Sequence, residues 1–321
     1  MMKYFIGPMS KNVVDAVMEY RETNLSQIGF IPSRRQIAYD GGYVNGWNTE
    51  SFAKYVSDCY ILRDHAGPAQ GKEEDDGYTS LAHDCENFNA IHIDPWKKYG
   101  DYQDGLKWTV DMIRYCYSIN SSIEYEIGTE QSIREFLPKD IDILLSDLER
   151  SLPSTHYEKI NYCVIQSGTS LKENKNTGDY DSDRLSSMVQ IVQKYGLMSK
   201  EHNGDYLPVA LIKDKFNLGL DSINIAPEFG QIETKTYLKN IDNNKEILNL
   251  YWKICYDSNK WIKWVDNSFD PIQNKVDLIN ICGHYVLSDN AFISKIKSLF
   301  PDIDLEIKTN IKNKLDNLFY G

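Results

Sequence analysis

The chain has 321 residues, a formal net charge of -12, 41% hydrophobic residues and 26% charged residues. This composition is ordinary for a soluble globular protein, and the length allows two medium domains or one large α/β barrel. Because an acidic chain repels nucleic-acid backbones and anionic membrane surfaces, neither is an expected partner, although a local basic spot can still bind a small anion.

Eight short β-rich runs alternate with longer amphipathic stretches along the first part of the chain. The runs cover residues 3–7, 28–32, 60–64, 90–94, 122–128, 161–168, 196–202 and 221–227. In the stretches between them, such as 104–119 and 181–196, apolar residues recur at steps of three and four, as in helices that pack on a sheet. After Gly230 the alternation stops, and the remaining sequence has a mainly helical pattern.

This alternation predicts a (β/α)8 TIM barrel, an α/β fold, over residues 1–235, followed by a helical extension over residues 236–321 that packs on the barrel. A doubly wound open sheet is the competing interpretation. It would usually show a GxGxxG loop after an early strand, and the segment DGGYVNG at 40–46 lacks that spacing. Two polar loops, 71–80 and 171–183, follow predicted strands and are therefore expected at the mouth of the barrel.

Polar side chains stand at or near the carboxyl ends of six successive predicted strands, which in a barrel open into one shared mouth. They are Asp64, His65, Asp94, Glu124, Glu126, Gln166, Ser167, Glu201, His202, Asp205, Tyr206 and Glu228. Two imidazoles with carboxylate or amide oxygens suit a divalent ion such as Zn²⁺, Mn²⁺ or Fe²⁺. A single strand-end His or Asp is more often a capping or hydrogen-bonding residue, but folding alone does not demand the whole set.

The other four histidines are interpreted as structural. His92 alternates with Ile91 and Ile93, so it points to the opposite face of its strand from them. The same structural role is expected of His83, His156 and His284.

Two adjacent arginines, Arg34 and Arg35, follow the second predicted strand. An arginine pair at the mouth of a barrel can hold a phosphate or a carboxylate. An ordinary solvated pair or a salt bridge to the acidic surface explains them equally well.

Seven short motifs follow one another in order along the chain. They are Ser-x-x-Gln with Gly-Gly-Tyr at 33–43, Asp-His-x-Gly-Pro at 64–68, IHID at 91–94, IGTE at 127–130, QSG at 166–168, HNGDY at 202–206 and YVLSD at 285–289. The series resembles the D-tagatose-bisphosphate aldolase non-catalytic (Z-type) subunit family, which is related to the class II metal-dependent aldolases. Arg63 and Ser167 stand where that family has Gly and Pro, and HNGDY replaces the phosphate loop of catalytic class II aldolases.

The resemblance implies a barrel fold and a sugar-type ligand. By analogy with the metal-dependent aldolases, a divalent ion, Zn or Mn, is expected on His65 and His202, with Gln166 and Glu126 as additional ligands. Asp64 is expected to act as the acid or base beside the metal. The further catalytic candidates are Asp94 and Asp205, and the substrate-binding candidates are Ser33, Arg34, Gln36, Tyr43 and Tyr206.

Two functions are compatible with these residues. The first is a metal-dependent carbohydrate enzyme that acts on a ketose or ketose phosphate by retro-aldol chemistry, as an aldolase (a lyase) or as an epimerase. The second is a non-catalytic subunit that binds and stabilises a class II tagatose-bisphosphate aldolase. The strand-end set favours the enzyme. The expected partners are a small sugar or sugar phosphate and either a class II aldolase subunit or further copies of the chain.

Targeting signals and disulfides are not expected. No apolar run has the length of a membrane span, and the start of the sequence lacks the apolar core of a signal peptide. The six cysteines are scattered without a CxxC spacing, so they are interpreted as reduced core residues. The expected location is the cytoplasm.

Overall fold

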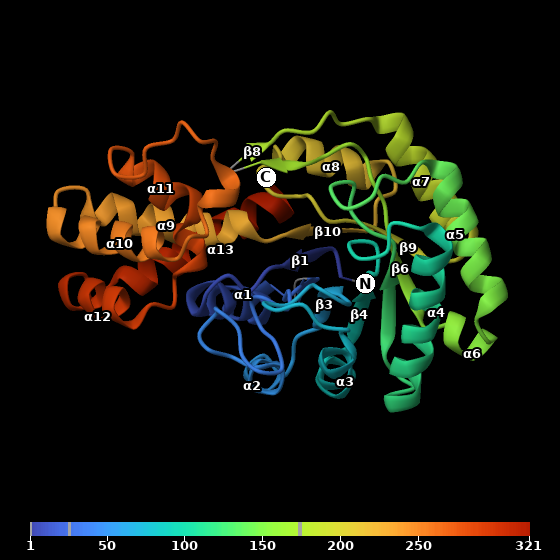
Figure 1. Cartoon of the computed structure of the whole chain (residues 1–321). Helices are drawn as coiled ribbons and strands as arrows, with labels where there is room; N and C mark the ends of the chain where they lie inside the picture. Colours follow the sequence, from blue (N-terminus) through green and yellow to red (C-terminus); the bar gives the residue numbers. More distant parts are fainter. Residues whose placement is uncertain (1, 25–26, 173–174) are drawn as a thin grey trace.

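Eight short apolar runs form the parallel strands of a barrel, as the alternation in the sequence predicts. The computed structural model describes residues 2–24, 27–172 and 175–321 (Figure 1). The barrel strands are β1 (Tyr4–Ile6), β2 (Ile28–Phe30), β3 (Leu62–Ala66), β4 (Ala90–Ile93), β5 (Glu124–Ile127), β6 (Ile160–Val164), β9 (Met198–Glu201) and β10 (Ser222–Ile225).

The strands are hydrogen-bonded in the order β2-β1-β10-β9-β6-β5-β4-β3. Two parallel bridges, Phe30 with Ile61 and Ser33 with Asp64, join the two ends of this sheet and close the barrel. The predicted TIM-barrel fold is therefore confirmed. An additional antiparallel pair, β7 (Leu171–Lys172) and β8 (Lys175–Asn176), lies in the predicted loop 171–183, of which residues 173–174 lie outside the described ranges.

Helices follow the barrel strands and surround them. They are α1 (Lys11–Asn24), α2 (Thr49–Tyr55), α3 (Tyr78–Asn87), α4 (Tyr102–Ile119), α5 (Pro138–Ser151), α6 (Ser154–Tyr157), α7 (Ser182–Lys194), α8 (Val209–Asn217) and α9 (Pro227–Ile241). The predicted domain border at residue 235 falls inside α9, so one continuous helix leads from the barrel into the C-terminal extension.

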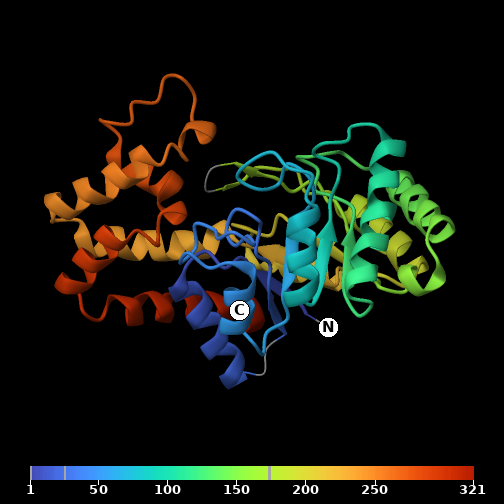
Figure 2. The ribbon, with the colours of Figure 1, turned by 60° about the horizontal axis from the view of Figure 1, so that its bottom comes forward.

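The C-terminal extension is helical. Its elements are α10 (Lys245–Asp257), η1 (Ile262–Trp264), α11 (Lys275–Cys282), η2 (Gly283–Tyr285), α12 (Asn290–Leu299) and α13 (Ile303–Tyr320). Helices α10 to α12 gather on one side of the barrel, whereas α13 returns beside α9 and packs on α1 (Figures 1 and 2). There the Tyr4 hydroxyl donates to the Leu318 carbonyl at 2.7 Å. The extension is thus anchored on the first strand of the barrel.

The apolar core has two parts. The larger part lies mainly between the strands and the helices, and it continues into the extension. A separate small cluster of buried residues consists of Phe5, Ile31, Leu62, Ala90 and Tyr162. Their neighbours along the chain pack in the larger core outside the strands. Since neighbouring side chains on a strand point to opposite faces, the five residues of the small cluster lie on the inner faces of strands or strand ends. The inner cluster forms an apolar floor, and polar side chains lie on the same inner faces towards the carboxyl ends.

Two further sequence expectations concern cysteines and membrane segments. All six cysteines are free and buried, as predicted. Within the described residues, none of the helices combines the length and the apolar character needed to cross a membrane.

Candidate metal centre

A bulge at the end of β3 brings two adjacent residues to the barrel mouth. Arg63 pairs with Ile91 and Ala66 pairs with Ile93, so Asp64 and His65 together lie opposite one residue of β4. His65 has a φ of 43°, in the left-handed region that non-glycine residues rarely adopt. In a regular strand neighbouring side chains point to opposite faces, so the bulge is what allows both Asp64 and His65 to face the mouth.

Arg63, directly before the bulge, is turned outward and fixed there. Its guanidinium is fully buried and forms a two-point ion pair with Asp84, at 2.9 Å from Nε and 2.6 Å from Nη2. Its Nη1 donates to the carbonyls of Pro32 and Ile37. This residue, which stands where the resembled family has Gly, therefore braces the strands from outside and does not narrow the cavity.

Four side chains converge at the mouth with atoms that can hold a metal ion. They are Asp64, His65, His92 and His202, and their ligand atoms all lie within 4.8 Å of one another. His65 Nε2 lies 3.4 Å from His202 Nδ1, and Asp64 Oδ1 lies 3.6 Å and 3.7 Å from these two nitrogens. The two histidines predicted to bind metal are thus brought together from strands on different sides of the barrel.

Each of the two predicted histidine ligands has a buried carboxylate behind it. His65 Nδ1 lies 2.6 Å from Asp94 Oδ2, which also accepts from Thr129 Oγ1. His202 Nε2 lies 2.5 Å from Glu126 Oε1. A carboxylate on the far nitrogen fixes the orientation and tautomer of an imidazole and leaves the near nitrogen for a metal.

The third imidazole, His92, contacts both of the others, whose ring centroids are 5.0 Å apart. Its Nε2 lies 2.9 Å from the Gly128 carbonyl, which places the proton on Nε2. Its Nδ1, left facing the bulge, accepts a long hydrogen bond of 3.3 Å from the His65 backbone N–H. Its ring centroid is 4.9 Å from that of His65 and 4.8 Å from that of His202. His92 was interpreted as a structural histidine from the sequence; the structure instead places it in the group.

Charges in and under the group are arranged in pairs. Glu126 is fully buried, and although burial favours its neutral form, its contacts with Lys200 and His202 hold its pKa far below the ordinary value. Lys200 Nζ lies 2.6 Å from Glu126 Oε2 and 3.8 Å from the centre of the Phe5 ring. Glu126 is therefore a fixed carboxylate that joins His202 to the floor of the barrel.

The protonation of the imidazoles differs by position. Burial lowers the pKa of His92 to about 4, so this ring is neutral at pH 7. Burial also acts against a charge on His65, but Asp64 and Asp94 overcome it and raise the pKa of His65 to about 10. A cation held by the imidazoles would take the place of this proton, since metal ligands must be deprotonated.

The spacing of these atoms fits a four-coordinate ion. Ligands at about 2.0–2.2 Å from a tetrahedral Zn²⁺ lie roughly 3.4 Å from one another. The 3.4 Å between His65 Nε2 and His202 Nδ1 agrees with this spacing, and Asp64 Oδ1 lies 3.6 Å and 3.7 Å from the same two nitrogens, beside the position of an ion. Within the described part of the chain, Asp64 Oδ1 is buried and has no hydrogen-bond partner. The set of imidazole nitrogens and one carboxylate suits Zn²⁺ and also Mn²⁺ or Fe²⁺.

A cavity of about 410 Å³ opens above this group. Four of the five predicted substrate-binding residues line it, namely Ser33, Arg34, Gln36 and Tyr43, together with the predicted catalytic residues Asp64 and Asp205. Tyr206 lies outside this lining; its backbone N–H donates to Glu228 Oε2 at 2.8 Å. Asp94 is buried behind His65.

Two predicted ligands have other partners. Gln166 donates to the carbonyls of Thr129 and Arg134 and accepts from the Phe136 N–H, so its amide supports the loop after β5. Glu126 contacts Lys200 and His202, one layer below the group. Neither belongs to the four-residue group.

Arg34 and Asp205 also have structural partners. Arg34 is buried and forms an ion pair with Asp75, with Nη1 at 2.9 Å from Oδ1. Asp205 accepts from the backbone N–H groups of Ala226 and Glu228 at the start of α9. Its burial raises its pKa to about 7, although the two N–H groups act in the opposite direction.

The cavity contains residues that sequence reasoning did not identify as ligands. Lys97 follows β4, Asn224 ends the inner face of β10, and four residues come from the extension: Lys263, Trp264, His284 and Tyr285. The motif YVLSD at 285–289 was the one signal near the extension residues, since Tyr285 belongs to it and His284 precedes it.

Comparisons with known proteins extend the description of the fold. No protein-family model matches the chain, and no curated protein matches its sequence. A solved structure of a probable tagatose 6 phosphate kinase from Sinorhizobium meliloti is similar over 99% of both chains, with a TM-score of 0.78 and 14% identity.

Two further structures are similar at lower scores. A fructuronate-tagaturonate epimerase from Cohnella laeviribosi has a TM-score of 0.66 and 11% identity, over 99% of this chain and 81% of the other. A fructose-bisphosphate aldolase from Campylobacter jejuni has a TM-score of 0.56 and 13% identity, over 94% and 90%. At these identities the likeness shows a common fold, and for the first two structures it includes the C-terminal extension.

Proposed function

We propose that this chain is a metal-dependent carbohydrate enzyme that acts on a ketose or ketose phosphate by retro-aldol and aldol chemistry, as an aldolase or a sugar epimerase. The observation that carries the proposal is the group of three imidazoles and Asp64 below the cavity. A divalent ion bound there supplies Lewis-acid polarisation of a substrate carbonyl.

The three imidazoles are the proposed ligands. One nitrogen of each of the three imidazoles is held by Asp94, by the Gly128 carbonyl or by Glu126. The other nitrogen is the proposed ligand atom, and in His92 an ion would replace the long hydrogen bond that Nδ1 accepts from the His65 N–H. Three protein ligands leave one position for substrate or water, which is the pattern of catalytic zinc sites. Gln166 and Glu126, expected from the resemblance to act as ligands, are assigned supporting roles.

Asp64 is the proposed acid and base. Its Oδ1 has no hydrogen-bond partner among the described residues and lies 3.6 Å from His65 Nε2, at the edge of the cavity. We assign it the role of taking the proton from the substrate hydroxyl when the carbon–carbon bond breaks and of returning it when the bond forms again. Asp94 acts through His65, which makes it a positioning residue.

The same residues serve two overall reactions. If the two fragments leave the cavity, the reaction is an aldolase cleavage; if they stay, rotate and rejoin, it is an epimerisation. The names of the similar structures include both kinds of enzyme.

A screen of ketose phosphates and uronates with added Zn²⁺ or Mn²⁺ tests the proposal, with products followed by NMR. We expect either two shorter fragments or one epimer of unchanged mass, and loss of that product in Asp64→Asn. A protein that binds stoichiometric metal but converts none of these substrates contradicts the proposal.

A second candidate is the non-catalytic subunit. The extension has exposed large apolar side chains, including Ile262, Ile272 and Leu305, which are 54%, 61% and 63% exposed and favour a protein partner. Mixing the chain with a class II tagatose-bisphosphate aldolase distinguishes the two. A chain that is inert alone but raises the activity or stability of that aldolase supports this candidate.

The cytoplasmic location stays a prediction.

A further inference from the structure

Three cationic side chains from separate parts of the chain line the cavity. Arg35 follows β2, Lys97 follows β4, and Lys263 belongs to η1 of the extension. All three are exposed, and within residues 2–24, 27–172 and 175–321 none of them forms an ion pair with a carboxylate. Arg35 and Lys97 donate instead to the backbone carbonyls of Gly71 and Ala69, at 3.4 Å and 2.9 Å.

The three cations act on one another. Although the Lys263 side chain is exposed, partial loss of hydration beside the cavity lowers its pKa, and the positive charges of Arg35, Lys260 and Lys97 lower it further. Burial and Arg35 likewise lower the pKa of Lys97, against a weaker opposite effect of Asp94. Like charges held together without a neutralising carboxylate are stabilised when an anion binds between them.

A buried imidazole from the extension adds a neutral donor. His284 lines the cavity and is 4% exposed, and burial, with the nearby charge of Lys263, lowers its pKa to about 3. Gln231 Nε2 donates to His284 Nδ1 at 3.1 Å, which places the ring proton on Nε2. In the described ranges Nε2 has no partner, although it is buried. The imidazole therefore offers one unused N–H.

The position of His284 is fixed by close packing. A Cβ at Gly230 of α9 would lie 2.8 Å from the His284 Cβ and 3.0 Å from the Met9 Cβ. Lys263 Nζ lies 4.3 Å from the centre of the Trp264 ring, and this cation–π contact restrains the Lys263 side chain. The extension thus presents a cation and a neutral donor to the cavity.

The carboxylates that line the same cavity do not form ion pairs with Arg35, Lys97 or Lys263 within the described residues. Asp64 belongs to the imidazole group, and Asp205 accepts from backbone N–H groups of α9. Glu130 accepts from Ser132 Oγ at 2.6 Å. Arg34 is already neutralised by Asp75, so Arg35 is the arginine of the pair that is left for a ligand.

We propose that Arg35, Lys97, Lys263 and His284 form a subsite for an oxyanion at one end of the substrate, either a phosphate ester or a sugar carboxylate. This inference rests on the proposed function: one end of the sugar substrate, with the carbonyl, lies at the imidazole group, and the anionic group of the same sugar lies at the subsite. The C-terminal extension is then a part of the active site that selects anionic sugars.

Calorimetric titration of the full chain at low ionic strength tests the subsite, with inorganic phosphate and D-glucuronate as separate probes. We expect at least one probe to bind, with a Kd raised about tenfold in Lys263→Gln and in Arg35→Gln, since each removes a charged donor. Lys98→Gln, an exposed neighbour of Lys97 outside the cavity lining, is the matched control and is expected to bind as the native chain does.

The outcomes separate this inference from the proposed function. His65→Ala is expected to retain anion binding, because His65 is not part of the subsite. Tighter binding of phosphate identifies a phosphate ester as the ligand, and tighter binding of glucuronate identifies a carboxylate. Absence of binding by both probes, or unchanged binding in an Arg35→Gln/Lys263→Gln variant with a native circular dichroism spectrum, overturns the subsite even if the metal centre is active.

Discussion

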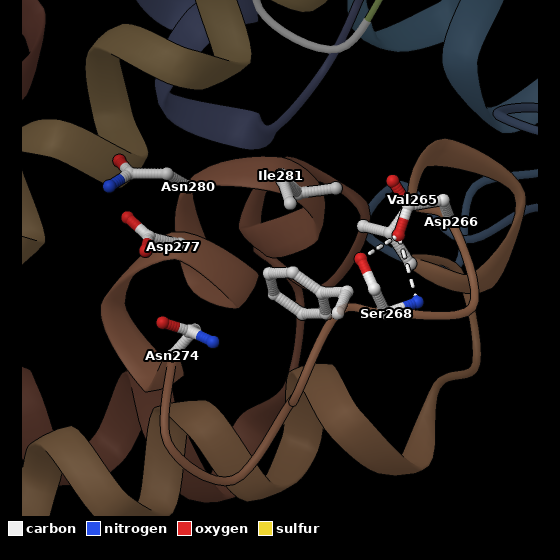
Figure 3. Close-up of a pocket in the computed structure, with 8 residues that line it drawn as sticks. Val265, Asp266, Ser268, Asn274, Asp277, Asn280 and Ile281 are labelled. Carbon is white, nitrogen blue, oxygen red and sulfur yellow. Dashed lines mark hydrogen bonds between the residues drawn. The ribbon is translucent and has the colours of Figure 1, made fainter.

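Two cavities of similar size differ in how the chain builds them. The mouth cavity, of about 410 Å³, collects residues from the ends of strands across the barrel and from the extension. A pocket of about 500 Å³ in the extension is lined by residues 265–281 alone (Figure 3): Val265, Asp266, Ser268, Phe269, Asn274, Asp277, Asn280 and Ile281. Size therefore does not distinguish the two, but the convergence of distant segments does.

The polar groups of the two cavities also have different uses. In the extension pocket, Asp266 Oδ1 accepts from the Ser268 N–H at 2.8 Å, and Asp277 lies in the first turn of α11. Both are common local arrangements at turns and helix starts. At the mouth, by contrast, Asp64 Oδ1 and His284 Nε2 are buried without partners among the described residues. Groups that local structure does not use are the ones available to a ligand.

Asp64→Asn is expected to give the largest loss of activity among the variants at the mouth. It keeps the shape of the side chain but removes the proposed base, so kcat should fall about 10²- to 10⁴-fold, the usual contribution of a general acid or base. Metal content, measured by mass spectrometry, should stay at the native level because the imidazoles are intact. Loss of the metal together with activity would instead make Asp64 a ligand.

Asp94→Asn tests the carboxylate that holds His65 from behind the imidazole group. Its oxygen can still accept from the backbone N–H of Trp96, but His65 loses its carboxylate partner. Metal affinity should fall about 10- to 100-fold, as for other carboxylate partners of histidine ligands. Competition with a chelating dye measures this, and Asp40→Asn, on an exposed residue, serves as the control. Equal metal affinities in Asp94→Asn and Asp40→Asn would show that Asp94 does not position His65 for the metal.

Asp205 provides an effect on stability that depends on pH and leaves the proposed metal ligands untouched. Its pKa rises from 3.8 in the unfolded chain to about 7 in the folded chain, so the folded state binds the additional proton between these values. The free energy of unfolding contributed by this group is present below pH 4 and is lost as the pH rises towards 7. Relative to the native chain, Asp205→Asn should therefore become more stable by a few kcal/mol between pH 4 and pH 8. Urea unfolding at both pH values measures the difference, and a constant difference contradicts the assignment.

The smallest effect is expected in the extension pocket. Asp277→Asn removes a charge from the first turn of α11 and should lower stability by about 0.3–1 kcal/mol without changing kcat or metal content. Thermal unfolding and a standard activity assay check this. A large loss of activity would contradict the difference in use between the extension pocket and the mouth cavity.

Much of the fold could be predicted from the sequence because the barrel repeats one local pattern. The fourth strand was expected at 90–94 and is found at Ala90–Ile93, and the eighth was expected at 221–227 and is found at Ser222–Ile225. Apolar periodicity is a local property, and closure of the barrel follows from eight such units. The division at 235 stays a prediction; residue 235 lies within α9, which continues from the barrel into the extension.

The site could be predicted in part. His65 and His202 were identifiable because they stand at the carboxyl ends of strands. The alternation of His92 with Ile91 and Ile93 gave the correct face, but the sequence did not show that this face is the inside of the barrel beside the other imidazoles. Glu126 lies on the same inner side, one layer lower.

Other parts of the site depend on contacts that no local pattern contains. Gln166 stands near a strand end as expected, yet backbone groups of residues 129–136 bind its amide. Lys263 and His284 reach the cavity only because the extension packs on α9, more than two hundred residues from Arg35 in the sequence. Tertiary packing decided these positions.

Metal stoichiometry tests the central claim most directly. Purified native chain, reconstituted with Zn²⁺ and freed of excess ion, should contain one ion per chain by mass spectrometry. The three single variants His65→Ala, His92→Ala and His202→Ala should each lose it, whereas His83→Ala, on an exposed histidine outside the group, should retain it. Full metal content in all three variants, each with a native circular dichroism spectrum, would contradict the account of this site.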